Sequence, residues 1–257
     1  FHPWVEGLSF GSKFASVPYP APTSAQVDHA HACMDVLRPL LTEARLGHIE
    51  RVSAGRTRHI SVVLENVYQS RNASAVMRSA DGFGLLDVHL IENENAWSRN
   101  KGVAKGASQW LQLHRHLGAD NAKQACIDRI KSHGHRLVVT SPHASGHTPE
   151  TLPLDQPVAL VMGTEFSGAS DFMMEHADAF VEIPMHGFTE SFNISVAAAV
   201  LMHRLNQRLR ASDISWTLDA SELAVLRAEW MFKSVRHASG ILAREGLTPP
   251  ATLLSNL

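Results

Sequence analysis

The segment Ala179–Arg210 constrains the fold of this 257-residue chain more strongly than any other stretch. Its sequence, AFVEIPMHGFTESFNISVAAAVLMHRLNQRLR, predicts a short strand over Phe180–Pro184, then a polar loop, then a helix. From Val196 to Met202 that helix is apolar on nearly every face, which is typical of a helix buried in a large core or against another subunit. Polar side chains therefore lie between two buried elements, where ligand sites at the end of a sheet are commonly formed.

Strands and helices alternate between residues 60 and 210, which predicts an α/β fold with a parallel sheet. The strand over Val158–Met162 is a continuous apolar run, as expected of a parallel strand covered on both faces. The other expected strands are Ile60–Leu64, Leu86–Ile91 and Arg136–Thr140. The expected helices are Ala73–Asp81, with Asn72 as its cap, Asn121–Lys131 and a short one that ends near His176.

The flanking segments divide the chain further. Residues 1–24 are rich in Pro, Gly and Ser and predict an irregular arm, without the pattern of a signal peptide. Residues 25–58 predict a helical extension with a break at Pro39, and residues 59–210 the α/β domain. Asp219 and Glu222 have the spacing of a capping box, which places a C-terminal helical extension within residues 211–257.

The composition excludes several classes of protein. A net charge of −2 argues against a general polyanion binder, although it allows a local basic patch. The 16 histidines show no paired spacing with cysteine, so no metal site is expected. Cys33 and Cys126 are unpaired in pattern, which favours a reducing, cytoplasmic location. No apolar run reaches the length of a membrane-spanning helix, so no membrane partner is expected.

Three polar clusters carry the candidate chemistry: Asn66–Arg78, Gly163–Gly168 and His186–Asn193. The first strand is followed by ENVYQSRN instead of a glycine-rich turn, which argues against a dinucleotide held by its pyrophosphate. No GK[ST] motif occurs, so a nucleotide bound by its phosphates is not expected. No GxSxG elbow occurs, so covalent hydrolase chemistry is not expected either. A ligand at these clusters would be bound largely by backbone groups, which favours a nucleoside without phosphates.

Three motifs occur in a fixed order along the chain. They are Asn72-x-x-Ala-x-x-Arg78, Val161-Met-Gly163-Thr-Glu165-Phe-Ser-Gly168, and Ile183-Pro-Met-x-Gly187 with Ser191-Phe-Asn193-x-Ser195. Together they resemble the motifs of the SpoU/TrmH family of RNA ribose 2′-O-methyltransferases, which belongs to the SPOUT superfamily. The resemblance spans about residues 45–210, and the flanking helices resemble its tRNA-modifying branch more than its rRNA-modifying branch.

The resemblance implies a SPOUT-type parallel sheet with a C-terminal deep trefoil knot, an exception to the rule that chains do not thread loops. It implies a homodimer, with Val196–Met202 in the knot core and the dimer interface. It also implies S-adenosylmethionine as cofactor, bound in the knot loops. The implied cofactor-binding residues are Gly163, Thr164, Glu165, Gly168, Ile183, Met185, Gly187, Ser191 and Phe192.

The implied reaction is methyl transfer to a ribose 2′-oxygen of tRNA, with guanosine at D-loop position 18 as the expected target; rRNA is the alternative substrate. The implied catalytic residues are Arg78, Asn72, Glu165, Ser191 and Asn193. A guanidinium has a pKa above ~12, so we favour a role for Arg78 in holding a phosphate or stabilising charge on the 2′-oxygen. An acidified Arg78 or a phosphate oxygen as the base stays open.

Each of these residues has a structural alternative. Asn72 and Asn193 can serve as helix caps, Glu165 as a helix-start carboxylate, and Arg78 as an ion-pair partner. The basic residues Arg45, Arg51, Arg56, Arg58, Lys101 and Lys105 either form solvated surface or bind RNA phosphates. An alternative of a different class is a catalytically silent RNA-binding protein of the same fold.

Overall fold

A six-stranded parallel sheet forms the centre of the protein, in the order β3-β2-β1-β5-β4-β6. The computed structural model describes residues 19–67, 70–92, 106–118, 121–142, 146–164 and 167–253. The strands are β1 (Ile60–Glu65), β2 (Asp87–Glu92), β3 (Gln112–Leu117), β4 (Arg136–Thr140), β5 (Val158–Met162) and β6 (Ala179–Val181). Every pairing between neighbouring strands is parallel, which confirms the predicted α/β class.

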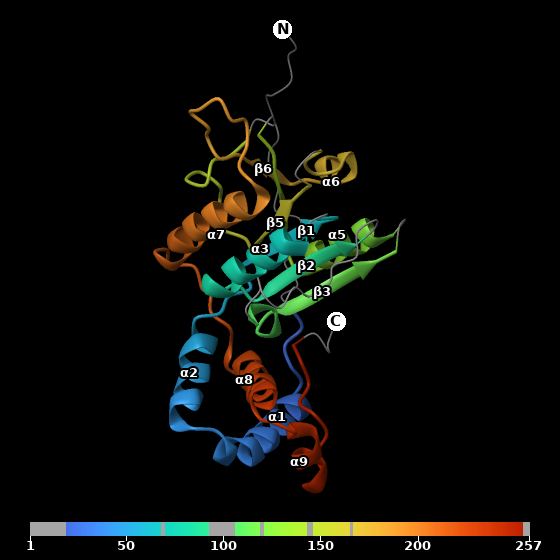
Figure 1. Cartoon of the computed structure of the whole chain (residues 1–257), viewed down its shortest axis with the longest axis vertical. Helices are drawn as coiled ribbons and strands as arrows, with labels where there is room; N and C mark the ends of the chain where they lie inside the picture. Colours follow the sequence, from blue (N-terminus) through green and yellow to red (C-terminus); the bar gives the residue numbers. More distant parts are fainter. Residues whose placement is uncertain are drawn as a thin grey trace.

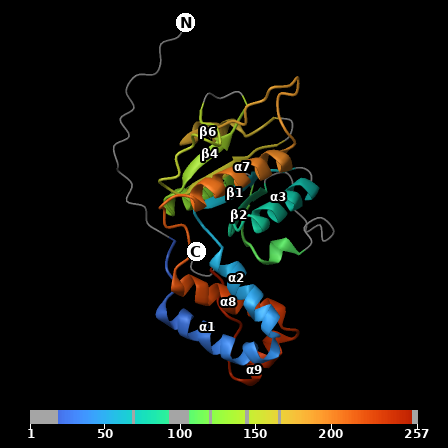
Figure 2. The ribbon, with the colours of Figure 1, turned by 90° about the vertical axis from the view of Figure 1, so that its left-hand side faces the viewer.

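Helices cover both faces of the sheet (Figure 1). On one face α3 (Ser70–Gly82) and α7 (Ile194–Arg210) pack side by side, as Figure 2 shows. On the other lie α5 (Ala122–Ser132) and α6 (Asp171–Glu175). Because successive strand residues point to opposite faces, Val62 joins the α3–α7 core and Val63 the α5–α6 core. This double cover explains why β1 and β5 are buried along their whole length.

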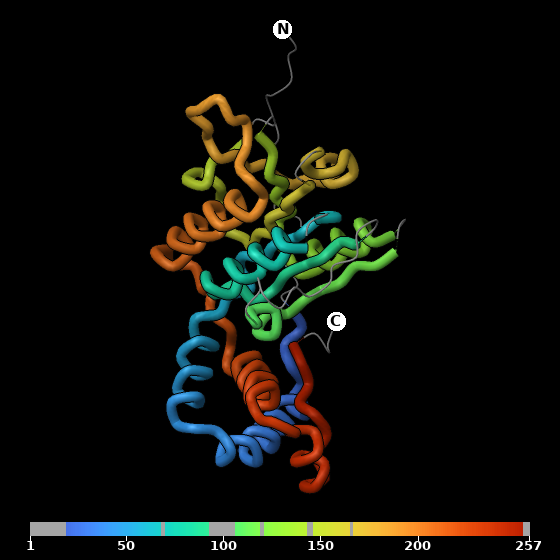
Figure 3. Tube along the Cα trace, viewed as in Figure 1, coloured from blue at the N-terminus to red at the C-terminus, as the bar shows by residue number. Residues whose placement is uncertain are grey.

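The remaining helices form a second body below the sheet in Figure 1, with an apolar cluster of its own. They are α1 (Ser24–Leu37), η1 (Arg38–Leu40), α2 (Glu43–Ala54), α8 (Ala220–Ser234) and α9 (Ala238–Arg244), while η2 (Ala107–Gln109) precedes β3. Figure 3 shows that this body joins the blue N-terminal and the red C-terminal parts of the chain. We name it the helical body.

The predicted start and break signals of the helical body are confirmed. Pro39 lies in the short 3-10 helix that separates α1 from α2. Asp219 begins α8 with a capping box, in which its side chain accepts from the backbone of Glu222 and the Glu222 side chain bonds back. Among the described residues, no helix is long and apolar enough to cross a membrane.

Two local predictions need correction, and a third is met only in part by the single chain. Helix α3 begins at Ser70, so Asn72 lies inside the helix and is not its cap. Strand β6 ends at Val181 and not at Pro184, whose ring nitrogen has no proton to donate to a ladder. On α7, the side chains of Val196 and Val200 are 46% and 38% exposed, so this apolar helix is not buried all round within one chain.

Candidate active site

A cavity of about 550 Å³ lies at the carboxyl ends of β4, β5 and β6. Its walls are the loop after β5, the segment after β6 and the first turns of α7. Seven of the residues predicted to bind a cofactor line it: Gly163, Thr164, Gly168, Ile183, Met185, Ser191 and Phe192. The two loops meet because the carboxyl ends of parallel strands share one edge of the sheet. Gly187 is not among the lining residues, and Glu165 lies outside the described ranges.

The loop after β5 closes tightly on itself. The backbone N–H of Thr164 donates to the Gly168 carbonyl at 2.8 Å, and the Gly168 N–H donates back to the Thr164 carbonyl at 3.1 Å. A Cβ on Gly163 would lie 2.1 Å from the backbone nitrogen of Ala169, far inside van der Waals contact. Gly168 has φ +68°, in the left-handed region. The loop therefore requires glycine at both positions.

A buried carboxylate, which the sequence analysis missed, holds this loop to the sheet. Glu65 ends β1 and is 2% exposed. It accepts hydrogen bonds from the Ser170 backbone N–H at 2.9 Å and the Ser170 hydroxyl at 2.5 Å, and Lys123 lies 3.1 Å away. The available signal was an acidic residue that directly follows the apolar run of β1. Glu65 thus positions the wall of the cavity without lining it.

The other wall is organised by the start of α7. Asn193 caps this helix, and its Oδ1 accepts from the Ser195 backbone N–H at 2.9 Å and the Ser195 hydroxyl at 2.6 Å. The structural interpretation of Asn193 as a helix cap is confirmed. Its catalytic role stays a prediction.

The charged side chains in the cavity lining are acidic. Asp171, Glu182 and Glu190 line it, and no lysine or arginine is among the lining residues of the described chain. Hydroxyl-bearing side chains such as Ser191, and apolar ones such as Leu201, supply the rest of the surface. Such a lining disfavours a phosphate-bearing ligand and suits one that combines apolar parts with positive charge.

The predicted catalytic residues are only partly brought together. Ser191 lines the cavity, but Arg78 and Asn72 lie on α3 and are not among the lining residues. Arg78 is exposed to solvent. Within one chain, the structure therefore leaves Arg78 on the exposed surface of α3 and not in the cavity wall.

Two of the predicted RNA-binding arginines are buried, so the prediction that they contact RNA is wrong. Arg56 is 1% exposed, forms an ion pair with Asp81 and donates to the Leu85 carbonyl at 2.8 Å. Arg58 is 8% exposed.

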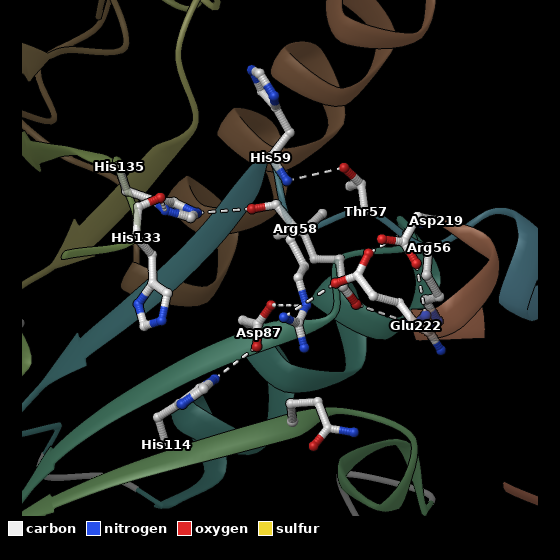
Figure 4. A network of polar contacts seen from close by, with 12 residues as sticks. Arg56, Thr57, Arg58, His59, Asp87, His114, His133, His135, Asp219 and Glu222 are labelled. Carbon is white, nitrogen blue, oxygen red and sulfur yellow. Dashed lines mark hydrogen bonds and ion pairs between the residues drawn. The ribbon is translucent and has the colours of Figure 1, made fainter. Parts of the chain in front are cut away.

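Figure 4 shows Arg58 between two carboxylates, with 3.4 Å to Asp87 and 3.3 Å to Glu222 of the helical body. Burial opposes the charged form of Asp87, but Arg58 and a hydrogen bond from His114 outweigh it and hold the pKa of Asp87 below its ordinary value. Both guanidinium groups are therefore buried and paired with carboxylates of the same chain, and neither is exposed for a phosphate contact.

The other basic candidates differ in exposure. Arg51 is exposed on α2, whereas Arg45 is half-buried, donates to the Ser234 hydroxyl at 3.3 Å and lies 5.2 Å from the ring centroid of Trp110. Arg51 is therefore the better candidate for a phosphate contact. Lys101 and Lys105 lie outside the described residues.

Comparison with protein families identifies the class of this protein. The model of the SpoU rRNA Methylase family matches residues 59–203, which is more than half of the chain. The chain belongs to this family. The matched residues include the whole sheet, α3 and the loops that line the cavity.

Curated relatives narrow the likeness to particular proteins. The chain is 41% identical over 202 residues to the tRNA (guanosine(18)-2′-O)-methyltransferase of Borreliella burgdorferi, covering 79% of this chain and 91% of the relative. It is 30% identical to the Thermus thermophilus protein of the same name, covering 75% and 98%. A Haemophilus influenzae 23S rRNA (guanosine-2′-O-)-methyltransferase is 31% identical, but only 63% of this chain and 65% of that protein are covered.

Solved structures have the same fold. The TrmH/SpoU tRNA modifying enzyme of A. aeolicus superposes with a TM-score of 0.66 at 24% identity, over 76% of this chain and 98% of that one. The AviRb methyltransferase of Streptomyces viridochromogenes, in complex with AdoMet, superposes with a TM-score of 0.50 at 21% identity, over 63% and 65%.

Proposed function

We propose that this protein is an S-adenosylmethionine-dependent tRNA methyltransferase that modifies the ribose 2′-oxygen of guanosine 18. The observation that carries the proposal is the likeness to tRNA (guanosine(18)-2′-O)-methyltransferases over 91% and 98% of their length. The aligned part is too long to be the methylase core alone, since it extends into the flanking segments of this chain. We also propose a cytoplasmic location, supported by the free, buried Cys33 and Cys126.

The cavity fits the cofactor in shape and charge. When bound, S-adenosylmethionine supplies a methyl group on a positively charged sulfur, a carbon that an oxygen nucleophile can attack. Asp171, Glu182 and Glu190 provide negative charge on the cavity wall, and Met162 and Leu201 provide apolar surface. Gly163 and Gly168 line the cavity without a side chain, which leaves their backbone accessible to a bound nucleoside.

Arg78 acts on the RNA. Its guanidinium keeps its charge in proteins, so it donates hydrogen bonds to a backbone phosphate or to the negative charge that develops on the 2′-oxygen. Bound S-adenosylmethionine would supply its methyl carbon to this oxygen and would leave as the neutral thioether, and the hydroxyl proton would pass to a base such as a phosphate oxygen. Asn72, Glu165, Ser191 and Asn193 complete this proposed set. Ser191 lines the cavity and Asn193 caps α7.

In the proposed homodimer, Arg78 and the cofactor cavity come together. In one chain Arg78 does not line the cavity, and the apolar side chains of Val196 and Val200 are exposed on α7. We propose that a second copy covers this face and completes the site. Light scattering on Val200→Glu is expected to detect a monomer with impaired cofactor binding, whereas the unaltered chain is a dimer.

The proposal includes a C-terminal knot and a division of the chain. Insertion of β5 between β1 and β4, with β6 beyond them, supports threading of the segment after β5. Pulling the chain from its two ends would test this, since a knot shortens the final extended length. We further propose a methyltransferase domain at residues 59–210, with an arm at 1–24, an RNA-binding helical extension at 25–58 and a C-terminal helical extension at 211–257.

In the decisive experiment, the purified full chain is incubated with methyl-labelled cofactor and one RNA substrate. Unmodified tRNA and rRNA are tested in separate reactions. Label is expected in tRNA, at guanosine 18 when the modified nucleotide is mapped. Label confined to rRNA would replace the substrate with rRNA, the second candidate that the Haemophilus influenzae relative suggests. Cofactor binding by calorimetry without transfer to either RNA would instead favour a catalytically silent RNA-binding protein.

A further inference from the structure

Two histidines and a cysteine meet between α5 and the strands β2 and β3. None of the three lines the cavity. His89 lies on β2, His116 on β3 and Cys126 on α5, with side chains 1%, 7% and 0% exposed respectively. One ligand atom from each residue lies within 4.8 Å of the other two. The histidines also contact each other, with 3.2 Å between His89 Nδ1 and His116 Nε2.

Buried nitrogens at this cluster lack partners among the described residues. His89 Nε2 has no hydrogen-bond partner there, although the residue is almost fully buried. The ring of His114 stacks on that of His89 with 4.3 Å between centroids, and its Nδ1 is likewise buried and unpartnered. A buried polar atom without a partner costs free energy, so the unpartnered Nε2 of His89, a member of the cluster, indicates a ligand.

An outer carboxylate orients the neighbouring histidine. His114 Nε2 donates to Asp87 Oδ1 at 2.7 Å, which leaves the lone pair on Nδ1 (Figure 4). This carboxylate–histidine pair is the arrangement that commonly orients metal-binding imidazoles. His89 and His116 each place a ring nitrogen within 4.8 Å of the Cys126 sulfur.

The charge near Cys126 is mixed. The carboxylate of Glu65 and the guanidinium of Arg129 both act electrostatically on this buried thiol. A divalent cation would displace its proton, and the resulting thiolate with Glu65 would compensate the positive charge.

We propose that His89, His116 and Cys126 form a structural zinc site that ties α5 to β2 and β3, with a water as the fourth ligand. Imidazole nitrogens and a thiolate are the ligand types that Zn²⁺ prefers. Zinc ligands in a tetrahedral shell lie roughly 3.5 Å apart, so movements of about 1 Å bring the three atoms to that spacing. The site is independent of the methyl-transfer chemistry.

The test uses the full chain, freed of metal with a chelator and titrated with Co²⁺, which occupies zinc sites and absorbs light. We expect one Co²⁺ per chain, a thiolate-to-cobalt charge-transfer band, and displacement by Zn²⁺. Cys126→Ser should lose the band and bind Zn²⁺ more than roughly 100-fold more weakly. Loss of a residue that only hydrogen-bonds to a ligand costs less than that. Cys33→Ser is the matched control, because Cys33 is also buried but lies in the helical body.

A second measurement covers the case in which Cys126→Ser does not fold. In the unaltered chain, Zn²⁺ should protect Cys126 and not Cys33 from a thiol reagent, as located by peptide mass spectrometry. Absence of the cobalt band in the unaltered chain, its retention in a folded Cys126→Ser, or equal labelling of Cys126 with and without Zn²⁺ would each overturn the proposal. The cluster would then be a hydrogen-bonded histidine pair beside an inert thiol.

Discussion

The two ends of the parallel sheet use polar residues in opposite ways. At the carboxyl end, Thr164, Ser191 and Glu190 face a cavity of about 550 Å³. At the amino end, where the sheet meets the helical body, Arg58 and Asp87 are buried and paired with each other and with their neighbours (Figure 4). Charged side chains at the carboxyl end face the cavity. At the amino end, Arg58 joins the sheet to Glu222 of the helical body.

Residue type alone does not separate these roles. Arg58 and Arg78 belong to the same short stretch of sequence, yet Arg58 is 8% exposed and Arg78 lies on the surface of α3. A buried, paired arginine acts on stability, because removing it strands a carboxylate in the interior. An exposed arginine is available to contact a substrate. Substitutions at the two ends should therefore affect different measurements.

The largest effect is expected from Arg58→Ala. Asp87 is 0% exposed and would keep a buried charge without its main partner. The free energy of unfolding should fall by about 3–5 kcal/mol. Denaturant unfolding followed by circular dichroism measures it, with Arg51→Ala, an exposed arginine of α2, as the control. A loss below about 0.5 kcal/mol would show that the two bodies do not depend on this ion pair.

Arg78→Ala should lower the methyl-transfer rate by about 10²–10³-fold, the range seen on removing one charge-stabilising donor. Unfolding and cofactor affinity should stay unchanged, because Arg78 is exposed and does not line the cavity. Single-turnover assays with tRNA measure the rate. Arg136→Ala is the control, since Arg136 pairs with Asp155 at the amino end of β4. Full activity in Arg78→Ala would remove this residue from the mechanism.

Gly163→Ala should weaken S-adenosylmethionine binding by about 10²-fold, because the new methyl group collides with the backbone of Gly168 and Ala169 and moves the loop. Calorimetry measures the dissociation constant. Gly47→Ala on α2, where a Cβ meets nothing within 4 Å, should leave the affinity unchanged. Equal affinity in both variants would place the cofactor away from this loop.

The amino end should lose stability in mild acid. Burial lowers the pKa of His135 to about 4, and its Nε2 donates to the Arg58 carbonyl at 2.8 Å. The unfolded chain binds a proton near pH 6.5 and the folded chain does not, so this contribution is complete above that pH and is lost as the pH falls toward 4.

The loss from His135 amounts to roughly 2 kcal/mol at about pH 5. Unfolding at a series of pH values should show a shallower slope for His135→Gln, which keeps a donor but does not titrate. An unchanged slope would assign the acid sensitivity to other groups.

The smallest effect is expected at the RNA surface. Arg51→Gln should reduce the slope of log affinity for tRNA against log salt by about 0.7–0.9, the value for one phosphate contact. Arg56→Gln should leave that slope unchanged where the protein is folded, because Arg56 is 1% exposed. Filter binding over a range of salt concentrations distinguishes the two. If Arg56→Gln changes the slope and Arg51→Gln does not, the RNA surface has been misplaced.

Elements with a strong local pattern were predictable. The apolar runs of β1 and β5, the capping box of α8 and the Asn193 cap of α7 were all visible in the sequence. Strand β3 was missed, because QLHRHL has three polar residues where an apolar face would be expected. Those residues, Gln112, His114 and His116, are buried by contacts with distant polar groups and not by apolar packing.

The sequence by itself determined the alternation of strands and helices and the two loops that form the cavity, because hydrophobic period, capping and glycine act over a few residues. Only the tertiary structure decided which charged and histidine side chains are buried and paired. Gln112 donates to Glu229 at 2.8 Å across 117 residues of sequence, and Ser170 bonds to Glu65 across 105. Whether such a polar group is available for chemistry depends on its partners in the folded chain. These partners are distant in sequence, so no local pattern predicts them.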